Sequence, residues 1–214
     1  MTDDLERTSD DMLIAGIAAG KPDALTWLFR RRQADVYRFA LHMSGATAVA
    51  DDVTQDVFLV VMREAARYQA GRSTVTAWLC GIARNCVRRR LEREARFDSL
   101  DALADDERAT LPATQPDPLG EISRVERIAM LRRAVLALPM RYREVVVLCD
   151  LEELSYADAA GALRCAIGTV RSRLHRARAM LAARLSALEA GGNDRAAAAA
   201  RPADASVTQK RCMA

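Results

Sequence analysis

The chain is poor in aromatic residues, in lysine and in long apolar runs. Aromatics make up 5% of its 214 residues, and Lys21 and Lys210 are the only lysines among 32 basic residues. Few β-branched runs disfavour a sheet protein, whereas the many alanines and leucines favour an all-α one. No apolar stretch approaches the ~20 residues of a membrane span, and the N-terminus lacks a signal-peptide pattern. We therefore expect an all-α protein that resides in the cytoplasm.

The sequence also lacks the usual signatures of catalysis and metal binding. Its five cysteines show no Cys-x-x-Cys pair and no Cys/His cluster with zinc spacing, which fits a reducing compartment. We find no glycine-rich phosphate loop, no His-Glu-x-x-His and no plausible Ser/His/Asp set. His42 lies among apolar neighbours and is interpreted as structural. We therefore predict no catalytic residue, no cofactor and no metal.

Charge is distributed unevenly, although the net charge is only +3. Residues 84–96 carry six arginines against two glutamates, and residues 97–121 carry seven acids against Arg108. From Arg164 to Arg184 there are six arginines and no acid. This alternation predicts two surfaces for a polyanion, separated by a segment that avoids it.

Helical periodicity divides the chain into two small domains. We expect a first bundle at 10–96, with separate helices around 25–29 and 36–43, and a flexible acidic linker at 97–120, where Pro112, Pro116 and Pro118 interrupt any helix. A second helical domain is expected at 121–188, and a disordered tail at 189–214. In the helix expected at 121–138, the residues predicted to face inward are Ile122, Val125, Ala129, Leu131 and Val135.

Residues 155–184 have the outline of a helix-turn-helix. Ser155 is a good N-cap for a short first helix. In the longer second helix, four apolar side chains fall in one sector at 100° per residue: Val170, Leu174, Ala177 and Leu181. Ser172, His175 and Arg176 lie opposite, with Arg171 and Arg178 flanking. We favour a DNA-reading helix over a solvated structural one.

Two further clusters have both a functional and a structural interpretation. Trp78 precedes Arg84, Asn85, Arg88 and Arg89, so an aromatic ring could stack on an unpaired base while arginines hold the backbone. Trp78 also lies on the apolar stripe of its helix, and core packing is at least as good an explanation for it. Asp52 and Asp56 form an acidic edge beside Phe58 that could dock a basic partner helix.

These motifs, in this order, resemble the extracytoplasmic-function sigma factors. Residues 51–58 (Asp-Asp-Val-Thr-Gln-Asp-Val-Phe) are similar to sigma region two, and 78–85 (Trp-Leu-Cys-Gly-Ile-Ala-Arg-Asn) to the stretch that follows it. Residues 138–145 and 168–178 are similar to region four. Cys80 and Gly81 depart from the pattern, because larger or basic residues are usual there.

The resemblance implies a protein that carries core RNA polymerase to promoters. It assigns Asp52, Gln55, Asp56 and Phe58 to the clamp helices of the largest polymerase subunit. It implies minus-10 contacts between Tyr68 and Arg89 and minus-35 reading by the second domain. The DNA-binding candidates are Tyr68, Trp78, Arg84, Asn85, Arg88, Arg89, Thr169, Arg171, Ser172, Arg173, His175 and Arg176. An anti-sigma factor is an implied further partner.

Two other kinds of protein fit the sequence less well. A stand-alone helix-turn-helix transcriptional regulator, such as a response regulator, would need a βαβ receiver pattern that the sequence lacks. A nucleic-acid enzyme would need metal-binding carboxylates in a formed site, yet the tight acid cluster, Asp51, Asp52 and Asp56, lies on one predicted helix.

Overall fold

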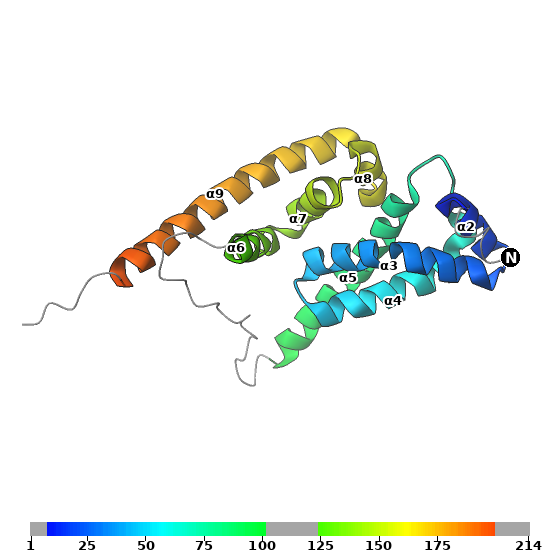
Figure 1. The fold of residues 1–214 in the computed structure, drawn as a ribbon, viewed down its shortest axis with the longest axis horizontal. Helices are drawn as coiled ribbons and strands as arrows, with labels where there is room; N and C mark the ends of the chain where they lie inside the picture. The colour runs from blue at the N-terminus through cyan, green and yellow to red at the C-terminus, as the bar shows by residue number, and fades with distance from the viewer. Residues whose placement is uncertain (1–7, 102–123, 200–214) are drawn as a thin grey trace, which may run out of the picture.

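The computed structural model describes residues 8–101 and 124–199, which contain helices and no β-strand. The helices form two groups (Figure 1). Helices α2 to α5 make one bundle, and α6 to α9 make the second, with α9 extending along its outer side. The prediction of an all-α protein with two helical domains is confirmed.

The first bundle follows local signals in the sequence. Ser9 caps α2 by accepting a hydrogen bond from the amide of Met12 at 3.3 Å, and Pro22 opens α3. Gly45 ends α3 with φ of 77°, a left-handed conformation that glycine adopts without strain. The elements are α2 (Asp10–Ala18), α3 (Pro22–Ser44), α4 (Thr47–Glu64), the short 3₁₀ helix η1 (Ala65–Arg67) and α5 (Val75–Asp101).

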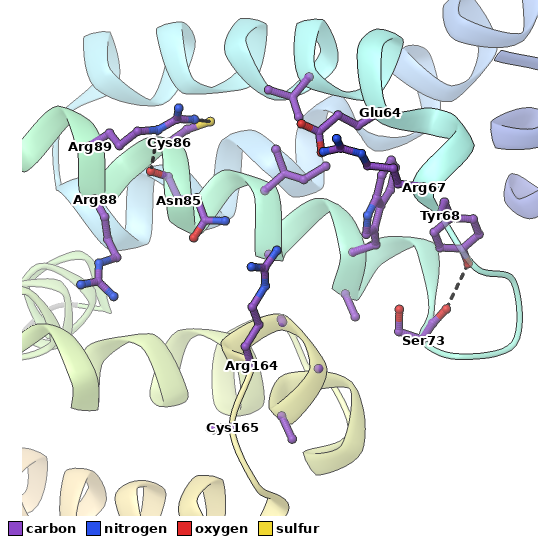
Figure 2. A pocket seen from close by; sticks show the side chains of 18 of the residues that line it. Glu64, Arg67, Tyr68, Ser73, Asn85, Cys86, Arg88, Arg89, Arg164 and Cys165 are labelled. Atoms are coloured by element: carbon purple, nitrogen blue, oxygen red, sulfur yellow. Dashed lines mark hydrogen bonds and ion pairs between the residues drawn. The ribbon is translucent and has the colours of Figure 1, made fainter. Parts of the chain in front are cut away.

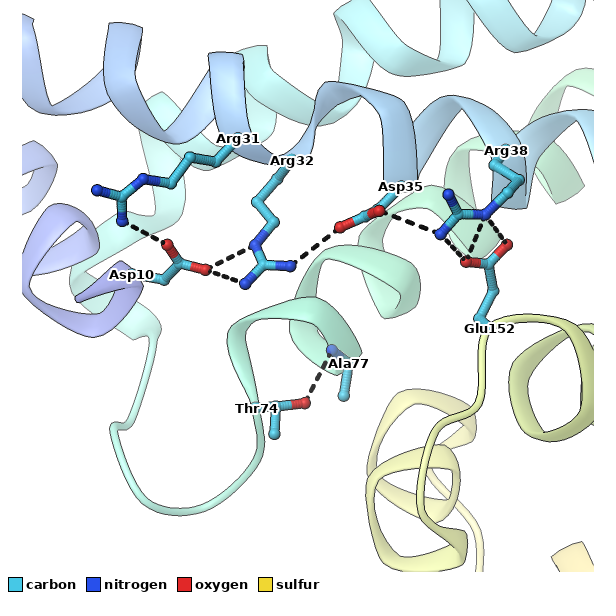
Figure 3. A network of polar contacts seen from close by, with 8 residues as sticks. All are labelled: Asp10, Arg31, Arg32, Asp35, Arg38, Thr74, Ala77 and Glu152. Atoms are coloured by element: carbon cyan, nitrogen blue, oxygen red, sulfur yellow. Dashed lines mark hydrogen bonds and ion pairs between the residues drawn. The ribbon is translucent and has the colours of Figure 1, made fainter. Parts of the chain in front are cut away.

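One continuous helix, α3, replaces the two separate helices predicted around 25–29 and 36–43. Between them lie Arg30, Arg31, Arg32 and Gln33, which are good helix formers, and no glycine or proline interrupts them. Ion pairs then fix this central turn, since Arg31 and Arg32 both contact Asp10 of α2 (Figure 3). The charged stretch is therefore helical surface and not a break.

The second bundle consists of α6 (Arg124–Leu136), α7 (Met140–Val146), the π-helical turn η2 (Val147–Leu151), α8 (Tyr156–Leu163) and α9 (Ile167–Ala199). The predicted N-cap of α8 is confirmed, because the Ser155 hydroxyl accepts from the amide of Asp158 at 3.0 Å. Arg164 ends α8 in a left-handed conformation with φ of 52°. The four apolar residues predicted to be buried in α9 are buried.

Two helices extend further along the chain than the sequence predicts. Helix α5 continues to Asp101, beyond the predicted start of the linker, and α9 continues through Gly191 and Gly192 to Ala199. The long alanine-rich run offsets the cost of about 1 kcal/mol per glycine in a helix. The remaining linker and tail, 102–123 and 200–214, lie outside the described residues.

The buried face of α6 also differs from the prediction. Val125 is 69% exposed and Leu131 is 39% exposed, against the prediction, whereas Val135 is buried as predicted. Met130 and Ala134, which were not predicted to face inward, are also buried. Helix α6 packs on α9 and α3, and the positions of these two neighbours decide which side of α6 is covered. Because α6 carries apolar residues on more than one side, its sequence alone does not determine which side is buried.

The two bundles contact each other closely. Helix α5 packs on α8, and α3 packs on α6 and η2. An ideal Cβ added to Gly81 of α5 would lie 3.5 Å from the backbone of Ala162 in α8, so α5 and α8 approach almost to backbone contact. At Gly45, which has a φ of 77°, an added Cβ would lie 2.6 Å from Cδ1 of Leu136, so that side chain would have to move. The arrangement therefore depends on small residues from both bundles.

Candidate nucleic-acid and polymerase interfaces

A broad groove runs along α4 and α5 and is closed on one side by α8 and the turn after it (Figure 2). Five predicted DNA-binding residues line it: Tyr68, Trp78, Asn85, Arg88 and Arg89. The structure thus brings these residues together from the loop after η1 and from α5. Arg164 of the second bundle extends into the groove toward Asn85.

The aromatic end of the groove is formed by Tyr68 and Trp78, whose ring centroids lie 5.2 Å apart. Both side chains are half-buried, so each keeps part of its surface open. The Tyr68 hydroxyl lies 2.6 Å from an Asp11 carboxylate oxygen and 3.0 Å from the carbonyl oxygen of Ser73. Burial, followed by the contact with Asp11, raises the pKa of Tyr68. The ring is consequently held as a neutral stacking surface.

Arg84 occupies a different place from its predicted DNA-binding neighbours. Its Nε donates to Oε1 of Glu144 at 2.6 Å, and Glu144 belongs to α7 in the other bundle. The Glu144 side chain is 2% exposed, and its second contact is Arg88 at 3.9 Å. In this arrangement Arg84 therefore faces the contact between the bundles, and its guanidinium is paired with an acid.

The predicted DNA-reading face of α9 is open to solvent. Arg171, Ser172, His175 and Arg176 are exposed. Arg173 is half-buried, and so is Thr169, whose carbonyl accepts from the Ser172 hydroxyl at 3.1 Å. Exposed guanidinium, imidazole and hydroxyl groups on one helical face suit hydrogen bonding to base edges and phosphates.

Two tyrosines hold arginines of this face, and the sequence interpretation had missed them. A hydrogen bond from Arg176, together with the charge of Arg141, lowers the pKa of Tyr142 in α7. Arg171 lies over the ring of Tyr156 in α8 at 5.9 Å from its centroid. Both tyrosines come shortly before the recognition helix in the sequence, but nothing in periodicity marks them as its neighbours.

The acidic edge predicted to dock polymerase lies along α4. Asp52 and Asp56 both contact Arg90 of α5, at 2.6 and 3.4 Å. Their side chains remain about half exposed, and Gln55 between them is exposed. Because Arg90 is the shared partner of both carboxylates, one positive charge is paired with two negative charges, and this edge of α4 keeps a net negative charge.

Phe58 lies beneath an apolar depression beside this edge. It is 6% exposed and meets Phe29 edge to face, with ring centroids 4.9 Å apart. The exposed apolar surface is supplied by Phe29, Leu59 and Met62, which sequence reasoning had not assigned to the interface. Phe58 therefore shapes the floor of the depression, and its neighbours form the contact surface.

Among the described residues we find no group of three or more His, Cys, Asp or Glu side chains placed to hold a metal ion. Over the same residues, no helix combines the length and apolarity needed to cross a membrane. Burial raises the pKa of Cys80 to about 12 and that of Cys149 to about 11. Both groups are therefore thiols at neutral pH, whereas Cys212 lies outside the described residues.

Family models match both bundles. The model "Sigma-70 region 2" matches residues 28–97, and "Sigma-70, region 4" matches residues 128–181. The chain is 36% identical over 190 residues to the ECF RNA polymerase sigma factor SigM of Mycobacterium tuberculosis, covering 87% of this chain and 90% of that protein. It is 40% identical over 153 residues to SigE of Mycolicibacterium smegmatis, covering 71% of this chain and 58% of SigE.

Two solved structures have similar folds. The sigma factor RpoE in complex with the anti-sigma factor NepR from Bartonella quintana has a TM-score of 0.59 and 26% identity, covering 74% of this chain and 94% of that one. CnrH in complex with the cytosolic domain of CnrY has a TM-score of 0.62 and 26% identity, covering 84% and 99%.

The chain belongs to the extracytoplasmic-function sigma factors. It is a subunit that directs RNA polymerase to promoters, and a stand-alone helix-turn-helix regulator is not favoured. The first bundle (α2 to α5) is called region 2 below, and the second (α6 to α9) is called region 4.

Proposed function

We propose that region 4 reads the minus-35 element, that the groove of region 2 holds one unpaired strand of the minus-10 element, and that α4 docks on the clamp helices of the polymerase. The observation that carries this assignment is the separation of three chemically distinct surfaces. One is a basic helical face, one a groove with both rings and arginines, and one an acidic edge beside apolar side chains.

The exposed face of α9 supports the upstream assignment. Arg171 and Arg176 present planar donors that suit guanine edges, and Ser172 and His175 add shorter donors. A buried face of Val170, Leu174 and Ala177 fixes the rotation of the helix, so these donors point outward together. Tyr142 and Tyr156 lie beside Arg176 and Arg171, respectively.

The groove supports the downstream assignment. Tyr68 and Trp78 offer ring surfaces at one end, and Asn85, Arg88 and Arg89 follow along α5. An unpaired strand needs both a stacking surface and cations along its backbone, and this spacing supplies both. Arg84 joins the set once it leaves Glu144.

The polymerase assignment is supported by charge and apolar area on one helix. Asp52, Gln55 and Asp56 form a polar edge, and Leu59 and Met62 lie exposed one and two turns further along α4. Protein interfaces commonly combine an apolar centre with a polar rim. A basic amphipathic partner helix fits this pattern.

Sigma factors as a family are initiation factors and not enzymes, and we propose the same for this chain, acting in the cytoplasm with core polymerase and promoter DNA. Because the structural relative RpoE was solved in complex with the anti-sigma factor NepR, we also propose an anti-sigma factor as a partner of this chain.

Run-off transcription tests the proposal. Purified core polymerase is combined with the chain and with sheared genomic DNA, and the transcripts are mapped to their start sites. We expect discrete starts that depend on the chain, and the double variant Arg88→Ala with Arg89→Ala should lose about tenfold or more of the signal. Arg133→Ala, an exposed arginine of α6, is the matched control. A chain that yields no specific start on any template would overturn the proposal.

A further inference from the structure

Acids of region 4 bond to donors of region 2 at three places along the contact. Glu144 pairs with Arg84 at 2.6 Å, and Glu152 pairs with Arg38 at 2.8 Å. Asp158 accepts from the amide of Thr74 at 3.0 Å and from its hydroxyl at 3.3 Å. Arg84 and Arg88 belong to the proposed strand-binding set, and Thr74 begins the helix that carries it.

The position of Asp158 is unusual for an intramolecular contact. Helix α5 has no acid in its first turn, so the positive end of its dipole is not balanced from within the helix. Asp158 supplies that negative charge from the other bundle. Burial raises the pKa of Asp158, but the bonds from Thr74 and Ser155 outweigh this and leave the pKa below its usual value. The carboxylate is thus held ionised at an anion-binding position.

Glu144 is a second acid of region 4, and it pairs with donors of the strand-binding set. A carboxylate with almost no exposure is costly unless it is paired, and its partners are Arg84 at 2.6 Å and Arg88 at 3.9 Å, both in region 2. When a DNA phosphate takes these guanidiniums, Glu144 loses them. The acid and the phosphate therefore compete for the same groups.

We infer that region 4 of this chain occupies the strand-binding surface of region 2 in the free protein, with Glu144 and Asp158 standing in for DNA phosphates. This inference rests on the proposed role of the groove. The occupant is α8 with its following turn, which borders the groove and sends Arg164 into it (Figure 2). The reading face of α9 stays exposed, so closure covers the downstream surface and leaves the upstream one open.

Gly81 lies where α5 and α8 approach each other closely. A Cβ added at this position would already stand 3.5 Å from the backbone of Ala162. Alanine fits at that distance as an ordinary contact, and we expect the further atoms of a leucine side chain to push α8 away. Gly81 therefore permits the close approach of α8.

The test measures binding of a short fluorescein-labelled single-stranded oligonucleotide of mixed sequence to the full free chain by anisotropy. We expect the double variant Glu144→Gln with Asp158→Asn to bind about tenfold tighter than the unmodified chain, since it removes the competing charges but keeps similar shapes. Glu153→Gln is the matched control, because it removes the charge of an exposed acid of region 4 and leaves Glu144 and Asp158 in place.

A second pair of variants tests closure without changing charge. Gly81→Leu should also tighten oligonucleotide binding about tenfold, whereas Gly81→Ala should bind as the unmodified chain does. Leucine favours a helix more than glycine does, so a loss of fold in α5 is not expected. Small-angle scattering should show Gly81→Leu to be more extended than Gly81→Ala.

Equal binding by the unmodified chain, the double variant and Gly81→Leu would overturn the inference. The unmodified holoenzyme separates this result from failure of the proposed function. If the holoenzyme initiates at specific sites but the variants bind the oligonucleotide as the unmodified chain does, only the inference that region 4 covers the groove is refuted. If the holoenzyme initiates at no specific site, the assignment of the groove itself is refuted.

Discussion

The guanidinium of Arg143 in α7 donates to the main-chain carbonyl of Met43 in α3 at 2.6 Å, joining the two regions. The same group donates to the carbonyl of Leu136 at the end of α6 and to that of Leu138, two residues further on. Arg143 thus satisfies carbonyls near the ends of two helices from different bundles. Burial lowers its pKa, as expected for a cation paired with carbonyls and with no carboxylate.

Arg143→Met should therefore lower the free energy of unfolding by about 2–4 kcal/mol, because buried carbonyls lose hydrogen bonds to a charged donor. Thermal denaturation followed by circular dichroism measures the effect. Arg141→Met, an exposed neighbour that stacks on Tyr142, should change stability much less. Equal losses in the two variants would show that the carbonyl contacts of Arg143 contribute little.

Arg176→Ala should weaken binding of upstream-element duplex by about 1–3 kcal/mol, because a base-reading guanidinium is lost. The measurement is fluorescence anisotropy with promoter DNA mapped by run-off transcription. Lys21→Ala removes one positive charge far from α9 and should leave this affinity unchanged. If Arg176→Ala binds as the unmodified chain does, Arg176 is not part of the reading face.

Tyr142→Phe should weaken the same binding by roughly 0.5–1.5 kcal/mol, the usual contribution of a single hydrogen bond. The ring remains, so only the hydroxyl that contacts Arg176 is lost. Combining it with Arg176→Ala should add no further loss, because the tyrosine acts through the arginine. Additive losses would mean that Tyr142 contacts DNA independently.

Asp56→Arg should weaken association with core polymerase while leaving upstream duplex affinity intact. The change reverses a charge on the α4 edge and repels Arg90, which Asp56 now contacts. Asp51→Arg makes the same charge change one turn earlier at an exposed position and serves as the control. Surface plasmon resonance against immobilised core enzyme measures both. Normal polymerase binding by Asp56→Arg would make the acidic edge purely structural.

His42 should make stability depend on pH. Burial, with the nearby charges of Arg132 and Arg38, lowers the pKa of His42 below its ordinary value of 6.5. The unfolded chain then binds the proton more readily, so the contribution of His42 is complete above about pH 6.5 and is lost as pH falls. Urea denaturation between pH 8 and 5 should show a smaller decline for His42→Gln, and parallel curves would contradict this.

Sequence reasoning predicted features that depend on local periodicity and capping. It placed Ser155 as a cap and Val170, Leu174 and Ala177 on a buried face, because a 3.6-residue repeat and a cap are visible within a few positions. The family motifs lie in these same local segments. The grouping of Tyr68, Trp78, Asn85 and Arg88 was predictable for the same reason.

Contacts between distant segments could not be predicted in this way. Arg84 and Glu144 are 60 positions apart, and Thr74 and Asp158 are 84 apart. No periodicity relates such positions, so neither pair was predicted. The buried face of α6 was predicted incorrectly, because which side of α6 is covered depends on where α9 and α3 lie.

Footprinting of the reconstituted holoenzyme on a promoter that it initiates tests the central claim most directly. The account predicts protection of two separate patches, one around minus 35 and one around minus 10, with permanganate-reactive unpaired thymines in the downstream patch alone. Protection of neither patch, with no unpaired thymine, would contradict it.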